Sequence, residues 1–190
     1  MTEQSNPLKI LFYVQHLLGI GHLKRTATLA RNMMQAGFDV TVVSGGHEID
    51  VDLGGARLIQ LPATRATDLY FKVLVDEEGQ QIDDAWRQKR ADRLLDIYHE
   101  HKPDMLITEL FPFGRRQMRF ELLPMLEAAS TDSPRPLIIS SVRDILVAQK
   151  KPGRNDEMLG LVETYFDYVM VHGDPELISL DKTFPHTARI

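Results

Sequence analysis

A histidine and an arginine follow two closely spaced glycines near the start of the chain. His22 comes directly after Gly21, with Gly19 just before that glycine and Arg25 one helical turn further on. Glycines let backbone N–H groups face an anion at a helix N-terminus, where the helix dipole also favours negative charge. A neutral imidazole there can take a proton from a hydroxyl while Arg25 or the amides hold a phosphate. The alternative is a tight turn with His22 as a surface residue at the helix start.

The spacing of these residues excludes two common nucleotide-binding motifs. In the dinucleotide fingerprint G-x-G-x-x-G the third glycine would fall at Lys24, and the second expected strand ends in Ser44 and two glycines instead of an acidic ribose ligand. The P-loop spacing G-x-x-x-x-G-K-[ST] is also missing from the loop. A different kind of phosphate contact is therefore expected here.

Glu109 ends a later apolar stretch, and Arg115 and Arg116 follow it closely. A carboxylate that ends a buried strand beside aromatic residues loses hydration, which is typical of functional sites. We interpret Glu109 as binding a substrate hydroxyl or orienting His22; the alternative is an N-cap or a salt bridge to a nearby arginine. Arg115 and Arg116 are predicted to begin a helix, the unfavourable end for cations, which indicates either an anionic ligand or an ion pair with Glu109.

Two more candidates close the last expected strands. Arg143 and Asp144 follow the fifth strand, and we interpret them mainly as an ion pair with each other, with Arg143 kept as a candidate for substrate binding. His172 ends the sixth strand, where it either lines a cleft or belongs to a turn.

Strand and helix patterns alternate along the chain. Short, uninterrupted apolar runs predict strands at 9–16, 38–44, 56–61, 105–110, 137–142 and 168–172, the first of them buried on both faces. Helical spacing predicts helices at 21–36, 84–101, 114–129 and 156–166, with Pro124 starting a new turn or kinking the third. Residues 71–75 and 80–82 flank a Glu-Glu-Gly turn that is typical of a surface hairpin.

This order predicts a single α/β domain with a Rossmann-like, doubly wound parallel sheet. Ligands of such sheets bind beyond the carboxyl ends of the strands. All the candidates named above follow strands at that edge, so we expect them to lie near one another.

Composition excludes several classes of function. The formal charge of −5 does not favour a nucleic-acid partner. The absence of cysteine excludes disulfides and thiolate metal sites and suits a cytoplasmic protein. No apolar run approaches the roughly 20 residues that span a bilayer, which leaves peripheral membrane contact as the remaining membrane role.

The segment LLGIGHLKRTATLARNMMQAGFDVTVVSGG resembles the opening of GT-B glycosyltransferases of the family 28 type, which includes peptidoglycan N-acetylglucosaminyltransferases, and of a group of predicted bacterial glycosyltransferases. Its pattern G-x-G-H-x-x-R is met from Gly19 to Arg25. ITELFPFGRRQMRFELLPMLEA, SVRDILV and VMVHGDPELI are also similar to that group, so the resemblance covers nearly the whole chain. Ile20 stands where the peptidoglycan enzymes have another glycine, so their lipid-linked acceptor is not carried over.

The resemblance implies an N-terminal acceptor-side domain at 1–180 and a linker from 181–190 toward a C-terminal donor-binding domain, without which this chain is inactive. The implied partners are a nucleotide-sugar donor and an unidentified acceptor, with no cofactor and no metal. His22 and Glu109 are the catalytic candidates. The candidates for substrate binding are Gly19, Gly21, Arg25, Arg115, Arg116, Arg143 and His172.

Two alternatives remain. A UDP-sugar 2-epimerase shares the two-domain GT-B plan and would act without an acceptor. A non-catalytic α/β ligand-binding domain would exist at this length alone and show a smooth polar C-terminal edge, whereas exposed apolar residues there would indicate a partner domain.

Overall fold

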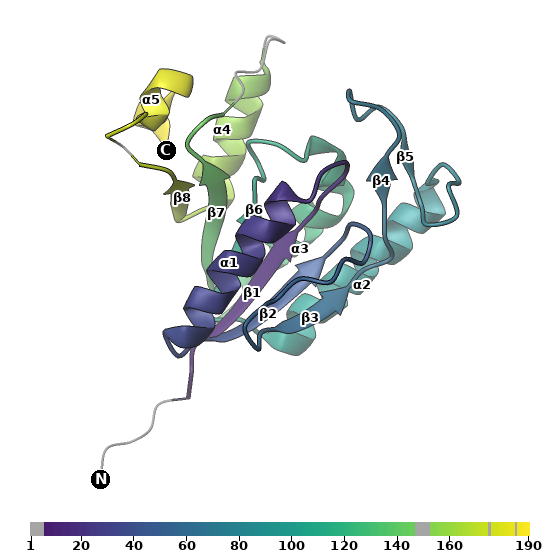
Figure 1. Ribbon diagram of the computed structural model, residues 1–190, viewed down its shortest axis with the longest axis horizontal. Helices are drawn as coiled ribbons and strands as arrows, with labels where there is room; N and C mark the ends of the chain where they lie inside the picture. Colours follow the sequence, from purple (N-terminus) through teal and green to yellow (C-terminus); the bar gives the residue numbers. More distant parts are fainter. Residues whose placement is uncertain (1–5, 147–152, 175, 185) are drawn as a thin grey trace.

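A six-stranded parallel sheet forms the centre of the computed structural model, which describes residues 6–146, 153–174, 176–184 and 186–190 (Figure 1). The order of its strands is β3-β2-β1-β6-β7-β8. Their bounds are β1 Lys9–Val14, β2 Asp39–Ser44, β3 Arg57–Gln60, β6 Met105–Glu109, β7 Leu137–Arg143 and β8 Tyr168–His172. The predicted α/β, Rossmann-like parallel sheet is confirmed.

Helices cover both faces of the sheet (Figure 1). They are α1 Gly21–Gln35, α2 Asp84–His101, α3 Arg119–Thr131, α4 Arg154–Tyr165 and the short α5 Leu180–Thr183, with 3-10 turns η1 at Arg116–Met118 and η2 at Thr187–Arg189. Within the described ranges, every helix is too short or too polar to cross a bilayer.

The strand β1 shows why both faces must be covered, because every residue of it after Lys9 is buried. Ile10 and Phe12 pack in the cluster that contains the apolar face of α1. Leu11 and Tyr13 point to the opposite face, into a second cluster built with α2 and α3. The alternation of side chains along a strand thus splits one continuous apolar run between two cores.

The strand order has one switch point, between β1 and β6. These strands are hydrogen-bonded neighbours, with Tyr13 opposite Thr108, yet they are far apart in the chain. The helix after β1 covers one face, while the helix after β6 covers the other. The connections therefore diverge at this position. We refer to the space beyond the carboxyl ends of β1 and β6 as the crevice, because it is the usual ligand position in this class of sheet.

A buried ion pair lies on the α2–α3 side of the sheet. The Arg90 side chain is fully buried, and its Nε donates to Glu121 Oε2 over 2.5 Å. Other guanidinium nitrogens donate to the carbonyl oxygen of Gly45 at 3.0 Å and to Gln15 Oε1 at 2.5 Å. Tyr13 donates its hydroxyl proton to Glu121. This network joins α2 and α3 to the loops that follow β1 and β2.

Gly45 fits tightly against this network, which makes a testable prediction. A Cβ at position 45 would overlap Gln15 Oε1 and the guanidinium of Arg90, whereas a Cβ at Gly19 meets nothing within 4 Å. Because Gln15 and Arg90 are locked by buried hydrogen bonds, we expect Gly45→Ala to lower the free energy of unfolding by about 1–3 kcal/mol. Gly19→Ala is the matched control, and equal urea midpoints for both variants would contradict the prediction.

The segment between β3 and α2 contains the predicted hairpin and one further strand pair. Val75 bridges Gln81, and backbone hydrogen bonds join Asp76 to Gln80 and Ile82 to Leu74 around the turn at 76–79, so the hairpin of 71–75 with 80–82 is confirmed. The strand β5 (Leu74–Val75) also pairs antiparallel with β4 (Arg65–Ala66), a pairing that was not predicted. Leu74 and Val75 are buried, so this segment joins the core and its pairing is not set by the turn alone.

The predicted helix at 114–129 divides differently as well. Arg115 takes a left-handed conformation with φ 60°, a 3-10 turn follows, and α3 then continues through Pro124. The interruption therefore lies before Arg119, and the helix does not restart at the proline. At the other end of the chain, Phe184 is buried against Phe113, so the segment at 181–190 is held to the domain by this residue.

Candidate functional site

His22 and Glu109 meet at the switch point of the sheet. His22 lies in the first turn of α1, which follows β1, and Glu109 is the last residue of β6. Nδ1 of His22 is 2.8 Å from Glu109 Oε1. The topology alone brings them together, because β1 and β6 are neighbours whose carboxyl ends share one edge.

Glu109 is fully buried but well supplied with hydrogen-bond donors. Arg25 donates to the same oxygen that His22 contacts, and Ser141 Oγ donates to Oε2 over 2.8 Å. Burial alone would raise the pKa of Glu109, but the hydrogen bonds from His22, Arg25 and Ser141 outweigh it and hold the pKa below its usual value. The carboxyl group is therefore an anion at neutral pH.

The charge of Glu109 assigns the tautomer of His22. Nδ1 also lies 3.2 Å from the guanidinium of Arg25, but the carboxylate is nearer and can only accept a proton. Nδ1 therefore carries the hydrogen and donates it to Glu109, which leaves Nε2 with a lone pair. The His22 side chain keeps 23 % of its surface exposed, so this lone pair belongs to a group that solvent reaches.

Ser141 and His172 extend the group across β7 and β8. Since the Ser141 hydroxyl proton goes to Glu109, its oxygen accepts from His172 Nε2 at 2.9 Å. Burial lowers the pKa of His172, and the positive charge of Arg25 lowers it further. A chain of hydrogen bonds thus runs from His22 through Glu109 and Ser141 to a neutral His172.

The glycine loop leads into α1, whose first backbone amides have no side-chain cap among the described residues. The residue before α1 is Ile20, and α1 has neither a side-chain cap nor an acidic residue in its first turn. A Cβ on Gly19 or Gly21 would meet nothing within 4 Å, so these glycines are not required by packing against the rest of the described chain. The unsatisfied N–H groups and the positive end of the helix dipole favour an anion there.

The structure places Arg115 and Arg116 differently from expectation. Arg115 donates from Nε to the carbonyl oxygen of Gln15 over 2.6 Å, and Arg116 forms an ion pair with Glu157 at 3.3 Å. The predicted alternative of a salt bridge between either arginine and Glu109 is wrong, since the partner of that carboxylate is Arg25. Burial lowers the pKa of Arg115, with the charges of Glu109 and Arg25 acting in opposite directions, so Arg115 lies near the pair.

Arg143 is not brought into the group. It is exposed, and among the described residues it forms no ion pair, so the predicted pairing with Asp144 is wrong. The backbone of Asp144 donates to the carbonyl oxygen of His172, and the Asp144 side chain packs against Gly173. The register of β7 and β8 sets this arrangement, because it places Arg143 opposite His172.

Some residues of the site escaped sequence reasoning. Ser141 is the residue whose omission matters most, because it donates to Glu109. It is a small polar residue in an apolar strand, and only the pairing of β7 with β6, which places it opposite Glu109, identifies it as part of the site. Nothing in the sequence tied Arg119, Arg154 and Glu157 to this edge. In the part of the chain that the structure describes, no cluster of three or more His, Asp or Glu side chains could hold a metal ion.

Comparisons with known proteins support the fold. No family model matches the sequence, and no curated protein does. Among solved structures, MurG of Acinetobacter baumannii matches at 12% identity with a TM-score of 0.50, covering 88% of this chain and 42% of that one. UGT2 of Phytolacca americana, solved with UDP-2-fluoro-glucose and pterostilbene, matches at 12% identity and a TM-score of 0.49, covering 95% and 51%. The calicheamicin glycosyltransferase CalG4 matches at 16% and 0.45, covering 85% and 43%.

This chain therefore spans about half the length of the chains it matches. At these identities the likeness establishes the fold: the chain has the architecture of one Rossmann-like half of a GT-B protein.

Proposed function

We propose that this chain is the acceptor-side half of a glycosyltransferase that moves a sugar from a nucleotide-sugar donor to an acceptor hydroxyl. The observation that carries the proposal is the geometry of His22, whose Nδ1 is fixed by the Glu109 carboxylate at 2.8 Å in the crevice of the sheet. A histidine oriented by a buried carboxylate is a general base with its second nitrogen available for a substrate proton.

The chemistry follows from that orientation. Nε2 of His22 takes the proton of the acceptor hydroxyl while the hydroxyl oxygen forms a bond to the anomeric carbon. The bond from that carbon to the phosphate oxygen breaks, and its electrons leave with the nucleoside diphosphate, so the anomeric configuration inverts. Glu109 remains ionised and stabilises the imidazolium through the Nδ1 hydrogen bond.

The glycine loop and Arg25 would stabilise the departing diphosphate. The uncapped amides at the start of α1 and the helix dipole favour negative charge, and they cost no reorganisation when that charge develops. Arg25 already faces Glu109 with one nitrogen, and its buried Nε has no hydrogen-bond partner among the described residues. His172 would act through Ser141 and Glu109, as a positioning residue.

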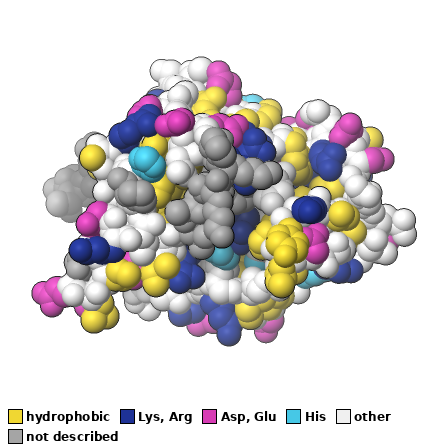
Figure 2. All heavy atoms as spheres, turned by 90° about the horizontal axis from the view of Figure 1, so that it is seen from above, with side chains coloured by type: hydrophobic (Ala, Val, Ile, Leu, Met, Phe, Trp, Pro, Cys, Tyr) yellow, Lys and Arg dark blue, Asp and Glu magenta, His cyan; other side chains and the backbone are white. Residues whose placement is uncertain are grey.

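The carboxyl edge of the sheet has the character of a surface that meets a second domain. Figure 2 looks onto this side of the molecule and shows hydrophobic side chains interspersed with basic and acidic ones. Several large apolar residues on loops at this edge are strongly exposed: Leu18 49%, Leu69 82%, Tyr70 79%, Ile145 42% and Leu177 85%. We propose that a donor-binding domain follows the segment at 181–190 in the full protein, closes on this edge and completes a cytoplasmic enzyme.

Acceptor-dependent release of nucleoside diphosphate is the experiment that tests the function. We expect the full-length product of the gene to release UDP, dTDP or GDP from one of a panel of nucleotide sugars, faster with a pool of hydroxylated acceptors than without. Mass spectrometry should then find an acceptor heavier by one sugar. An epimerised sugar formed without any acceptor would instead identify a 2-epimerase, and no turnover across the panel would contradict the proposal.

A further inference from the structure

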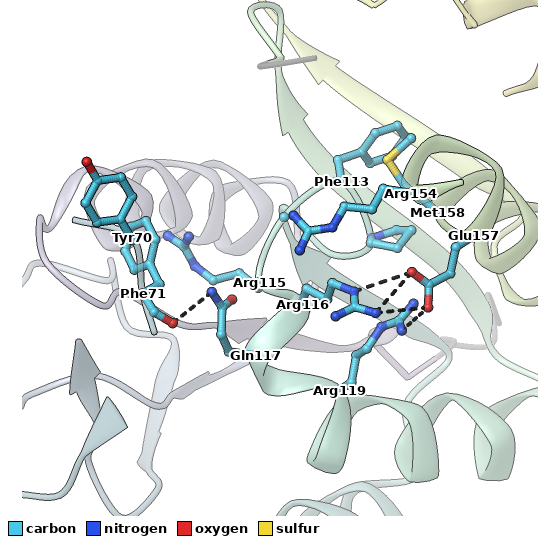
Figure 3. A pocket seen from close by; sticks show the side chains of 12 residues that line it. Tyr70, Phe71, Phe113, Arg115, Arg116, Gln117, Arg119, Arg154, Glu157 and Met158 are labelled. Atoms are coloured by element: carbon cyan, nitrogen blue, oxygen red, sulfur yellow. Dashed lines mark hydrogen bonds and ion pairs between the residues drawn. The ribbon is translucent and has the colours of Figure 1, made fainter. Parts of the chain in front are cut away.

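A pocket of about 280 Å³ opens beside the loop that follows Glu109 at the end of β6 (Figure 3). Three parts of the chain line it: the loop after β6, the first turns of α4, and the loop before β5 that carries Tyr70 and Phe71. Arg115 lies in its wall and donates to the carbonyl oxygen of Gln15, directly after β1, so the pocket and the candidate catalytic pair share one edge of the sheet. We call it the arginine pocket.

The arginine pocket carries an excess of positive charge on a protein whose formal charge is −5. Its lining includes four arginines and one carboxylate, Glu157. The four arginines come from separate elements of the fold, the loop after β6, η1, α3 and α4: Arg115, Arg116, Arg119 and Arg154. Glu157 is the one carboxylate in this lining and offsets only part of the charge, so a bound anion would reduce the repulsion between the arginines.

The structure already shows how these arginines bind an oxyanion. Glu157 receives hydrogen bonds from both Arg116 and Arg119, and Figure 3 shows the two guanidinium groups converging on its carboxylate. The hydrogen bond from Arg119 is the main reason that the pKa of Glu157 lies below its usual value. Glu157 is an exposed side chain on α4, so a ligand anion can replace it as the acceptor of these hydrogen bonds.

Two arginines are not engaged with Glu157. Arg115 uses its Nε for the carbonyl oxygen of Gln15, and no hydrogen bond from its other guanidinium nitrogens occurs in the described ranges. Arg154 begins α4 and extends toward Arg116 over the same space (Figure 3). Guanidinium groups hold phosphate and carboxylate in a bidentate manner, so this set suits a planar or tetrahedral oxyanion.

Apolar side chains form the rest of the wall. Phe113 and Met158 are buried, and Pro112 is also part of the lining. Tyr70 and Phe71 stand on the opposite side in Figure 3. The Tyr70 side chain is 79% exposed and thus free to cover a bound ring. A ligand that fills this space has both a charged end and an apolar face.

We propose that the arginine pocket binds a phosphate or carboxylate group carried by a substrate with an aromatic or otherwise apolar portion. The lining of the pocket alone supports the binding of such an anion. The assignment of this anion to the acceptor rests on the proposed function. Because Arg115 lines the pocket and contacts Gln15 directly after β1, an acceptor bound there would have a hydroxyl near His22.

Phenyl phosphate is the probe, titrated into the 190-residue chain by calorimetry at low ionic strength and without any donor. We expect measurable binding that weakens as salt is added, because the charges lie at the surface. Inorganic phosphate should bind more weakly than phenyl phosphate, and phenol should not bind at all. Benzoate in place of phenyl phosphate decides between carboxylate and phosphate as the preferred anion.

Charge variants of opposite sign make the test specific. Arg116→Gln or Arg154→Gln should weaken phenyl phosphate binding about tenfold, the effect of losing hydrogen bonds to a charged group. Glu157→Gln should strengthen it several-fold, because it removes the competing carboxylate from Arg116 and Arg119. Arg93→Gln is the matched control, since Arg93 is exposed on α2 and lines a different surface with β3.

A loss of binding in Glu157→Gln would overturn the proposal, because it would show that the carboxylate only holds the wall in shape. Equal binding of phenol and phenyl phosphate, an equal effect of Arg93→Gln, or no binding at millimolar concentration would do so as well. None of these results depends on glycosyl transfer. Failure of the pocket and failure of the proposed function are therefore distinguishable.

Discussion

Replacing Arg90 with alanine should lower the free energy of unfolding by about 3–5 kcal/mol. Arg90 is fully buried and donates to Glu121, Gln15 and two backbone carbonyl oxygens. Without it, the Glu121 carboxylate stays buried with only the hydroxyl of Tyr13 as a hydrogen-bond donor among the described side chains. An uncompensated buried charge of this kind is among the most destabilising changes that one substitution makes.

The same ion pair predicts a non-additive double variant. Arg90→Met with Glu121→Leu removes both charges, so it should cost at least about 1 kcal/mol less than the sum of the two single variants. Arg93→Ala, an exposed arginine of the same helix, should change stability by no more than about 0.5 kcal/mol. Urea unfolding followed by circular dichroism measures the native protein and all five variants. Circular dichroism avoids the fluorescence of Trp86, whose ring lies 5.4 Å from the Arg90 guanidinium.

This description of the core would be contradicted if Arg90→Ala lowered the free energy of unfolding by less than about 1 kcal/mol. It would also be contradicted if the effect of the double variant equalled the sum of the effects of its two single variants. Either result would mean that water or another group replaces Arg90 beside Glu121.

The fold was predictable because its signals are local and repeated. Continuous apolar runs marked the six strands, and helix α2 begins and ends where its periodicity predicted, at Asp84 and His101. Gly37 ends α1 with φ 90°, as a glycine after a helix should. These features depend on neighbours within a few residues, so a sequence alone carries them.

The candidate site was predictable only in part, since its contacts cross between strands. The rule that ligands bind at the carboxyl edge selected His22 and Glu109 without knowing that β1 and β6 are neighbours. The pairing of Glu109 with Arg25, in preference to Arg115 or Arg116, depends on that strand order. Ser141 depends on it as well, because a serine in an apolar strand has no signal until its register partner is known.

Long loops account for the remaining errors. The left-handed backbone at Arg115 turns its side chain toward Gln15 and delays α3 until Arg119. The turn signal at 76–79 predicted the hairpin but not the second partner of β5, the strand β4, which pairs with it where Leu74 and Val75 are buried. Both outcomes are set by tertiary packing, which propensities do not contain.

His22→Ala should lower turnover by about 10²- to 10⁴-fold in the full-length protein, the usual contribution of a positioned general base. The fold should survive, because Glu109 keeps its hydrogen bonds from Arg25 and Ser141 when the imidazole is removed. His99→Ala is the matched control: His99 is an exposed histidine in the last turn of α2, far in the fold from the crevice.

Glu109→Gln should also lower turnover, since it removes the negative charge that orients and stabilises His22. It also leaves Arg25 facing a neutral amide in a buried position, so its effect combines chemistry with stability. The His22→Ala variant therefore tests the catalytic role more specifically than Glu109→Gln does.

The most direct measurement compares nucleoside diphosphate release by the native full-length protein and by His22→Ala, at saturating donor and acceptor. We expect the variant to lose at least about a hundredfold in rate while its urea midpoint and its binding of the donor stay unchanged. Equal rates in the two proteins would contradict the assignment of His22 as the base, and with it the central claim about this site.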